Sequence, residues 1–222
     1  KALQPLAGRP LLEHVIDTAR SLGPAAIHVV YGHGGERVPA AFAGEPVTWT
    51  LQGERRGTGH ALQQAMPQVP DDHVVLVLYG DVPLIRRATL LELLAPGPRA
   101  GLSLLTARTD DPAGYGRIVR DRNGSVRRIV EEKDASRAQL AIRECNTGVL
   151  AAPARLLRHW LALLKPDNSQ REYYLTDVIA LAVKDRVRVR PVVAGDPVEV
   201  LGVNDKAQLA QVEAAWRAQA AR

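Results

Sequence analysis

The sequence predicts an α/β protein with a mostly parallel sheet and a smaller antiparallel lobe. Three observations support this fold class. Helical and strand patterns alternate along most of the chain, as in parallel sheets covered by helices. The apolar run at 74–78 is continuous, as expected of a strand buried on both faces. Later, two strand-like segments flank Asn123-Gly124, a strong signal for an antiparallel hairpin.

The elements follow from apolar spacing and from the turn residues between them. Pro10 opens the first helix, which Gly23-Pro24 ends. Next we expect strands at 27–31, 47–51, 73–78 and 102–107, alternating with helices at 36–42, 58–66 and 87–94. The hairpin strands 116–120 and 126–131 come next. They are followed by a strand at 144–151, helices at 154–164 and 175–185, strands at 187–193 and 198–203, and a helix at 205–220.

Composition argues against a nucleic-acid-binding protein and is compatible with small phosphorylated ligands. The net charge of +5 comes from 24 Arg and 5 Lys scattered along the chain, and aromatic residues make up only 4%. Cys145 is the single cysteine, which excludes an internal disulfide. No apolar run approaches the length of a membrane span. We therefore expect a cytoplasmic protein with neither nucleic acid nor membrane as a partner.

The end of the predicted strand at 73–78 is the most informative site in the sequence. Tyr79-Gly80-Asp81 follows it, at the carboxyl edge where open α/β sheets bind ligands. Gly80 allows close approach of a ligand, and Asp81 offers a hard oxygen to a divalent cation. A plain turn in which Asp81 caps the next helix explains the same residues.

A glycine-rich segment joins another strand to a helix. Gln52 ends that strand, and its paired donor and acceptor suit the edge of a pyrimidine. Gly57, Thr58 and Gly59 begin the helix, where backbone amides favour an anion or a polar base edge. A glycine-rich turn with Thr58 as the helix cap is the alternative.

Polar residues suited to a sugar recur in the second half of the chain. Gly116 offers a backbone amide, and Glu131 is expected to point into the cleft. Asn146 can bind a hydroxyl or acetamido group, whereas Thr176 could simply cap a helix. Asn204 ends the last predicted strand and, with Asp81, would give a two-residue Mg²⁺ site completed by phosphates and waters. Each motif alone is weak.

The order of the motifs is specific. Gly-Thr-Gly-His-Ala, Tyr-Gly-Asp-Val-Pro-Leu, Gly-Tyr-Gly-Arg-Ile, Val-Glu-x-Lys-Asp, Asn-Thr-Gly, Glu-Tyr-Tyr-x-Thr-Asp and Gly-Val-Asn occur in one series. This series closely resembles the uridylyltransferase domain of the bacterial bifunctional GlmU family. The resemblance spans the chain from Lys1 to the last helix and implies the Rossmann-like nucleotide-diphospho-sugar transferase fold.

The resemblance also implies an activity and the residues that perform it. The family transfers UMP from UTP to N-acetylglucosamine-1-phosphate, giving UDP-N-acetylglucosamine, a cell-wall precursor, and pyrophosphate, with Mg²⁺ as cofactor. Asp81 and Asn204 resemble its metal ligands, and Lys1 its cation beside the transferring phosphates. The remaining matches are Gln52, Gly57, Thr58, Tyr79 and Gly80 for the nucleotide, and Gly116, Glu131, Asn146, Tyr174 and Thr176 for the sugar.

Two parts of the family pattern are not in this sequence. We expect residues 1–204 to form the uridylyltransferase domain, without the first strand and the Gly-rich loop, and 205–222 to form an exit helix. The family's repeat domain, which carries acetyl transfer and the contacts of its trimer, is absent, so the resemblance implies a monomer here. Two rivals remain: a non-catalytic sugar-nucleotide-binding module, and a related transferase for another sugar.

Overall fold

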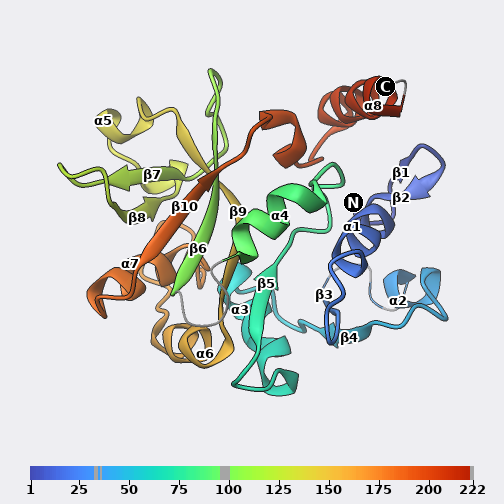
Figure 1. The fold of residues 1–222 in the computed structure, drawn as a ribbon, viewed down its shortest axis with the longest axis horizontal. Helices are drawn as coiled ribbons and strands as arrows, with labels where there is room; N and C mark the ends of the chain where they lie inside the picture. Colours follow the sequence, from blue (N-terminus) through green and yellow to red (C-terminus); the bar gives the residue numbers. More distant parts are fainter. Residues whose placement is uncertain (33–34, 36, 96–100, 221–222) are drawn as a thin grey trace.

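The computed structural model describes residues 1–32, 35, 37–95 and 101–220, and it confirms the α/β fold class (Figure 1). The largest sheet has the order β10-β6-β9-β7-β8, with β5 also paired to β9. A separate parallel pair consists of β3 and β4. The bounds of these strands are β3 (His28–Tyr31), β4 (Thr48–Leu51), β5 (Val74–Val77), β6 (Leu102–Arg108), β7 (Arg117–Arg120), β8 (Val126–Val130), β9 (Glu144–Pro153) and β10 (Val189–Val193).

The helices follow most of the expected ranges. They are α1 (Leu11–Arg20), α2 (Arg37–Ala41), α3 (Thr58–Ala65), α4 (Arg87–Leu94), α5 (Arg137–Leu140), α6 (Ala154–Leu163), α7 (Asp177–Lys184) and α8 (Lys206–Ala220). Glu36, which begins the helix predicted at 36–42, and residues 221–222, which end the predicted exit helix, lie outside the described residues. Within the described ranges, no helix is both long and apolar enough to cross a membrane.

The predicted mostly parallel sheet needs a correction, because the large sheet is mixed. β10 is parallel to β6, but β9 is antiparallel to both β5 and β6. Strands β5, β6 and β10 therefore share one direction, and β9 enters between β5 and β6 in the opposite one. Because a strand buried on both faces is apolar in either direction, its sequence does not reveal which one it takes.

Side chains of β9 alternate between two cores, one on each face of the sheet. Leu150 and Ala152 belong to the core formed with α6 and α7, whereas Val149 and Ala151 belong to the core formed with α4. Strand geometry explains the alternation, since successive side chains point to opposite faces. The sheet is therefore covered by helices on both faces, as the α/β class requires.

The antiparallel lobe is confirmed as the β7–β8 hairpin. Asp121 Oδ1 accepts hydrogen bonds from the amides of Asn123 and Ser125, at 2.9 and 3.0 Å, and Gly124 adopts a φ of 79°. The glycine removes the steric cost of that left-handed conformation. α5 follows β8 and was not predicted. Ser136 and Gln139 begin this helix with a capping box.

Two elements differ from the sequence-based expectation. The predicted strand at 198–203 is wrong: Pro197–Val200 is a 3₁₀ turn, capped by the Asp196 carboxylate. Glu199 is buried in it and accepts a 2.7 Å hydrogen bond from the Thr89 hydroxyl. A short hairpin, β1 (Pro5–Leu6) and β2 (Arg9–Pro10), precedes α1 and was not predicted.

The two ends of the chain pack together. Leu6 and Leu11 share a core with Val212 of α8, and the Trp216 ring meets the edge of His14 with centroids 4.7 Å apart. In Figure 1, α8 accordingly lies beside the hairpin and α1. A groove of about 640 Å³ separates the hairpin from α8, and it is lined by none of the predicted site residues.

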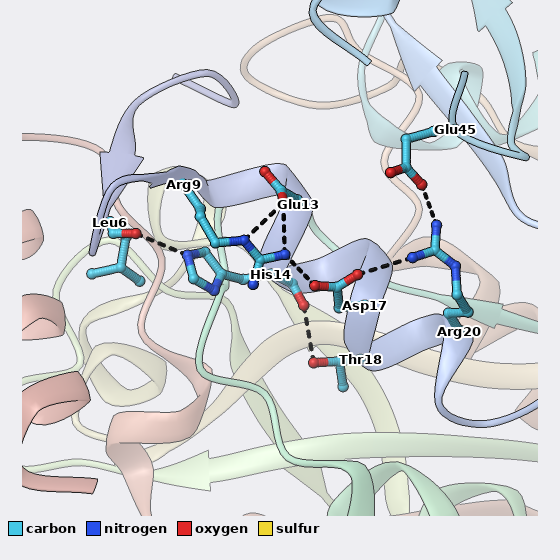
Figure 2. A network of polar contacts seen from close by, with 8 residues as sticks. All are labelled: Leu6, Arg9, Glu13, His14, Asp17, Thr18, Arg20 and Glu45. Atoms are coloured by element: carbon cyan, nitrogen blue, oxygen red, sulfur yellow. Dashed lines mark hydrogen bonds and ion pairs between the residues drawn. The ribbon is translucent and has the colours of Figure 1, made fainter. Parts of the chain in front are cut away.

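Exposed ion pairs extend along α1 (Figure 2). Arg9 bridges Glu13 and Asp17, which are one turn apart on the helix, and Arg20 joins Asp17 to Glu45. These contacts connect β2 and α1 to the segment before β4. Partly exposed pairs of this kind contribute little free energy each, so the buried cores remain the main source of stability.

Candidate active site

Lys1, Asp81 and Asn204 meet at the carboxyl end of β5. The Lys1 ammonium donates to Asp81 Oδ2 at 3.2 Å and also to Asn204 Oδ1. The backbone holds the two acceptors together, because the amide of Val203 donates to the Asp81 carbonyl at 2.9 Å. The structure therefore brings together three residues that the sequence separates by 80 and 203 positions.

The donor set of this corner fits a hard divalent cation. The Asp81 carboxylate and the Asn204 amide oxygen both accept hydrogen bonds from the Lys1 ammonium. A metal cation in the place of this ammonium would therefore have both oxygens as ligands. Mg²⁺ prefers such oxygens and keeps several other positions for waters or phosphates. No cluster of three or more His, Cys, Asp or Glu occurs in the parts of the chain that the structure describes. The fit thus rests on the Asp81–Asn204 pair.

The glycine-rich segment is bound to the loop that begins at Glu172. The amide of Gly59 donates to the Tyr173 carbonyl at 2.8 Å, and the amide of Leu175 donates to the Thr58 hydroxyl at 3.1 Å. A Cβ on Gly57, whose φ is 99°, would lie 2.7 Å from the Tyr173 carbonyl oxygen. The glycines therefore permit close packing of two chain segments. Thr58 does not cap α3, because its hydroxyl is engaged by Leu175.

Gln52 lies directly after β4 and reaches across to this segment. Its side-chain Nε2 donates to the Gly57 carbonyl at 3.1 Å and lies 3.0 Å from Nδ1 of His60. The expected neighbours of the base, Gln52, Gly57 and Thr58, are therefore together. His60 joins them, although the sequence pattern assigned it no role beyond membership of the motif.

Tyr79 links the nucleotide residues to the predicted sugar residues. Burial raises the pKa of Tyr79 to about 12, the charge of Glu131 adds to the rise, and a hydrogen bond with Thr58 opposes it. The phenol is thus protonated at neutral pH and available as a neutral donor. Gly148, with a φ of 83°, makes room for the ring: a Cβ there would lie 2.7 Å from Tyr79 Cζ.

Gly148 had no assigned role in the sequence. Its only signal was a glycine inside a strand, which often marks a close approach. Gly80, in the turn after β5, also has little space for a side chain, since a Cβ there would lie 3.1 Å from Leu12. Both glycines allow the protein's own side chains to pack around Tyr79 and Asp81.

The predicted sugar residues gather around Glu131. Thr176 donates its hydroxyl to Glu131 Oε1 at 2.9 Å, and a Cβ on Gly116 would lie 3.3 Å from Glu131 Oε2. Burial raises the pKa of Glu131, the hydrogen bond from Thr176 opposes the rise, and the charges of Asp177 and Asp134 add to it. The carboxyl is therefore a partly buried group that the Thr176 hydroxyl holds in position.

Asn146 and Tyr174 complete this side. The backbone N–H of Asn146 donates to the Gly116 carbonyl at 2.8 Å. The side-chain Oδ1 of Asn146 accepts from the Gly148 backbone N–H at 3.0 Å. The side-chain Nδ2 is the remaining hydrogen-bond donor of Asn146. The Tyr174 hydroxyl accepts a 2.8 Å hydrogen bond from Gln170, which the sequence did not identify.

Comparisons with known proteins identify the family of this chain. The model of the MobA-like NTP transferase domain matches residues 1–217. Bifunctional protein GlmU of Alkalilimnicola ehrlichii is 57% identical over 98% of this chain and 47% of its own length. The GlmU of Halorhodospira halophila is 57% identical over 100% and 46%. The chain thus spans about half the length of the curated relatives it matches.

Solved structures support the fold at lower sequence identity. A nucleotidyl transferase from Methanothermobacter has a TM-score of 0.70 at 21% identity, covering 99% of this chain and 86% of its own. A putative glucose-1-phosphate thymidylyltransferase from Bacillus anthracis has a TM-score of 0.71 at 18% identity, covering 97% and 85%. The chain belongs to the MobA-like NTP transferase domain family, in which it is a nucleotidyltransferase domain of the GlmU type.

Proposed function

We propose that the chain transfers UMP from UTP to N-acetylglucosamine-1-phosphate, giving UDP-N-acetylglucosamine and pyrophosphate. The observation that carries the proposal is the convergence of the Asp81 and Asn204 oxygens on the Lys1 ammonium near the end of β5. It lies where α/β sheets bind ligands. The family and the GlmU relatives support nucleotidyl transfer.

Asp81 and Asn204 are the residues that would hold Mg²⁺. When bound, the ion supplies positive charge to the phosphate groups of the nucleotide. Lys1, already beside both oxygens, would then turn to the transferring phosphates and offset their charge from the protein side.

The chemistry requires alignment and charge compensation more than proton transfer. A phosphate oxygen of the sugar phosphate attacks the α-phosphorus of UTP, a new P–O bond forms, and the bond to the leaving pyrophosphate breaks. The attacking oxygen is anionic near neutral pH, so no general base is needed. Gln52, Gly57 and Thr58 would orient the base, while Tyr79, with Gly80 beside it, would donate to the sugar-phosphate path.

The sugar side would select by buried hydrogen bonds. Glu131, fixed by Thr176, and Asn146 Nδ2 offer an acceptor and a donor to hydroxyl and acetamido groups. Gly116 and Tyr174 border the same carboxyl. A buried acceptor left unpaired by the wrong sugar costs binding free energy, which is the basis of discrimination. A cytoplasmic location and a monomeric state remain predictions.

The test is release of pyrophosphate from UTP and N-acetylglucosamine-1-phosphate, with and without Mg²⁺. It should be run on this chain and on the same chain fused to the Gly-rich loop that the family resemblance implies. Mg²⁺-dependent turnover by either chain supports the proposal. Binding of UDP-N-acetylglucosamine with no turnover by either chain would instead favour a non-catalytic sugar-nucleotide-binding module.

A further inference from the structure

The amide of Gln52 is held in one orientation by its neighbours. Its nitrogen lies 3.1 Å from the Gly57 carbonyl oxygen and 3.0 Å from His60 Nδ1. Since a carbonyl oxygen only accepts hydrogen bonds, the end of the amide that faces Gly57 is the NH₂ group. Both of its hydrogens are then directed at Gly57 and His60. In the part of the chain that the structure describes, the amide oxygen Oε1 receives no hydrogen bond.

The backbone around Gln52 keeps this oxygen accessible. The backbone N–H of Gln52 donates to the Tyr31 carbonyl at 2.8 Å, which extends the β3–β4 ladder and fixes the main chain. A Cβ on Gly32 would lie 3.6 Å from Oε1 and 3.2 Å from the Gln52 carbonyl oxygen. Glycine at position 32 therefore leaves space beside a single, fixed acceptor at the end of β4.

The orientation of Gln52 is linked to the tautomer of His60. To accept from Gln52, Nδ1 must carry a lone pair, so the neutral ring holds its proton on Nε2. That nitrogen lies 3.2 Å from Gln64 Nε2, and the Gln64 amide can accept the proton by turning its oxygen toward the ring. Turning it gives up the 3.1 Å bond from Gln64 to the His60 carbonyl, and because two oxygens would then face each other, the Gln64 side chain must also rotate away from that carbonyl. A proton on Nδ1 would instead face the Gln52 donor and force that amide away from Gly57.

We infer that His60 is a positioning residue that sets the base specificity of the nucleotide site. By holding the Gln52 nitrogen, it presents Oε1 to the base as an acceptor. Uracil offers an N–H donor at N3, whereas cytosine has a bare acceptor there, so two acceptors would oppose each other. The inference rests on the proposed uridylyl transfer and adds His60 as the residue that makes the site select uracil over cytosine.

The test compares His60→Asn with His60→Leu. Asparagine can place an oxygen acceptor near the position of Nδ1, whereas leucine fills the space without one. The affinities for UDP- and CDP-N-acetylglucosamine are measured by calorimetry, alongside pyrophosphate release with UTP and CTP. We expect the uridine-to-cytidine preference to fall about tenfold or more in His60→Leu and to stay within about threefold of wild type in His60→Asn. His159→Leu, at an exposed histidine of α6, is the control.

A second measurement works without any nucleotide. The imidazole nitrogens of His60 are observed by NMR and assigned by their loss in His60→Asn, and we expect the proton on Nε2. A proton on Nδ1 overturns the inference, as does an unchanged base preference in a folded His60→Leu or an equal loss in both variants. If the wild-type chain prefers neither nucleotide, the proposed function fails, while the NMR result still decides the tautomer.

Discussion

The cation corner and the sugar side belong to one site but differ in exposure and charge. The cation corner consists of Lys1, Asp81 and Asn204, with side chains of Lys1 and Asp81 48% and 26% exposed. The sugar side is built around Glu131, which is partly buried and whose pKa is raised first by burial, and Thr176, which is buried. An open, charged corner suits the exchange of ions and phosphates. A partly buried, hydrogen-bonded cluster suits discrimination between sugars.

The largest effect is expected from Asp81→Ala, which removes the charged half of the cation corner. Metal-dependent pyrophosphate release should fall by at least about 10²-fold, because the phosphate charge loses its main protein-held compensation. The thermal midpoint should change little, since the side chain is partly exposed. Near-normal turnover in Asp81→Ala would contradict the metal assignment.

Asn204→Ala tests the neutral half of the same corner. Losing one oxygen should raise the Mg²⁺ concentration for half-maximal turnover by about tenfold or more, with a smaller effect at saturating metal. A magnesium titration of the variant measures this directly. Gln208→Ala is a matched control, because Gln208 Oε1 accepts a 2.6 Å hydrogen bond from the backbone N–H of Asn204 and not from its side chain. An unchanged magnesium requirement would remove Asn204 from the site.

Gly148→Ala acts between the two regions through Tyr79. The methyl group would collide with the Tyr79 ring, and the residue would keep a left-handed φ of 83°. We expect a loss of about 1–3 kcal/mol in the free energy of unfolding and weaker binding of UDP-N-acetylglucosamine. Gly195→Ala is the control, since a Cβ there meets nothing within 4 Å. Equal effects at both glycines would show that the Tyr79 contact is unimportant.

Glu131→Gln separates the sugar side from the cation corner by its pH dependence. Folding raises the Glu131 pKa above its ordinary value of 4.5 and so favours the protonated form. Its contribution to stability is full below that value and is lost as the pH rises through the raised pKa. Compared with Glu131→Gln, the wild type should therefore lose unfolding free energy from about pH 4 towards neutrality. Denaturant titrations at several pH values that run parallel for both proteins would contradict this assignment.

The smallest effect is expected from Glu45→Ala, in the ion-pair ladder of Figure 2. Arg20 keeps its second partner, Asp17, at 3.0 Å, and both Arg20 and Glu45 are partly exposed. The free energy of unfolding should fall by less than about 1 kcal/mol, and turnover should not change. A larger loss would show that exposed charges in this molecule contribute more than the comparison of the two regions assumes.

Local sequence signals were sufficient for most elements. The Asn123-Gly124 turn, the helix at Pro10 and the apolar run before Tyr79 each depend on neighbours within a few positions, and all three are found. The strand expected at 198–203 failed for a tertiary reason. Pro197 and the buried Glu199, held by Thr89 of α4, favour a 3₁₀ turn over pairing with a sheet.

By itself, the sequence determined the α/β class, the hairpin lobe and the chemical types at the site. These depend on periodicity, turn residues and donor chemistry, which are short-range properties. Only the tertiary structure decided that β9 runs antiparallel through the sheet, that Gly148 leaves room for the Tyr79 ring and that His60 lies beside the Gln52 side chain. These depend on packing between segments, often far apart in the chain, and on directions that local apolar patterns do not encode.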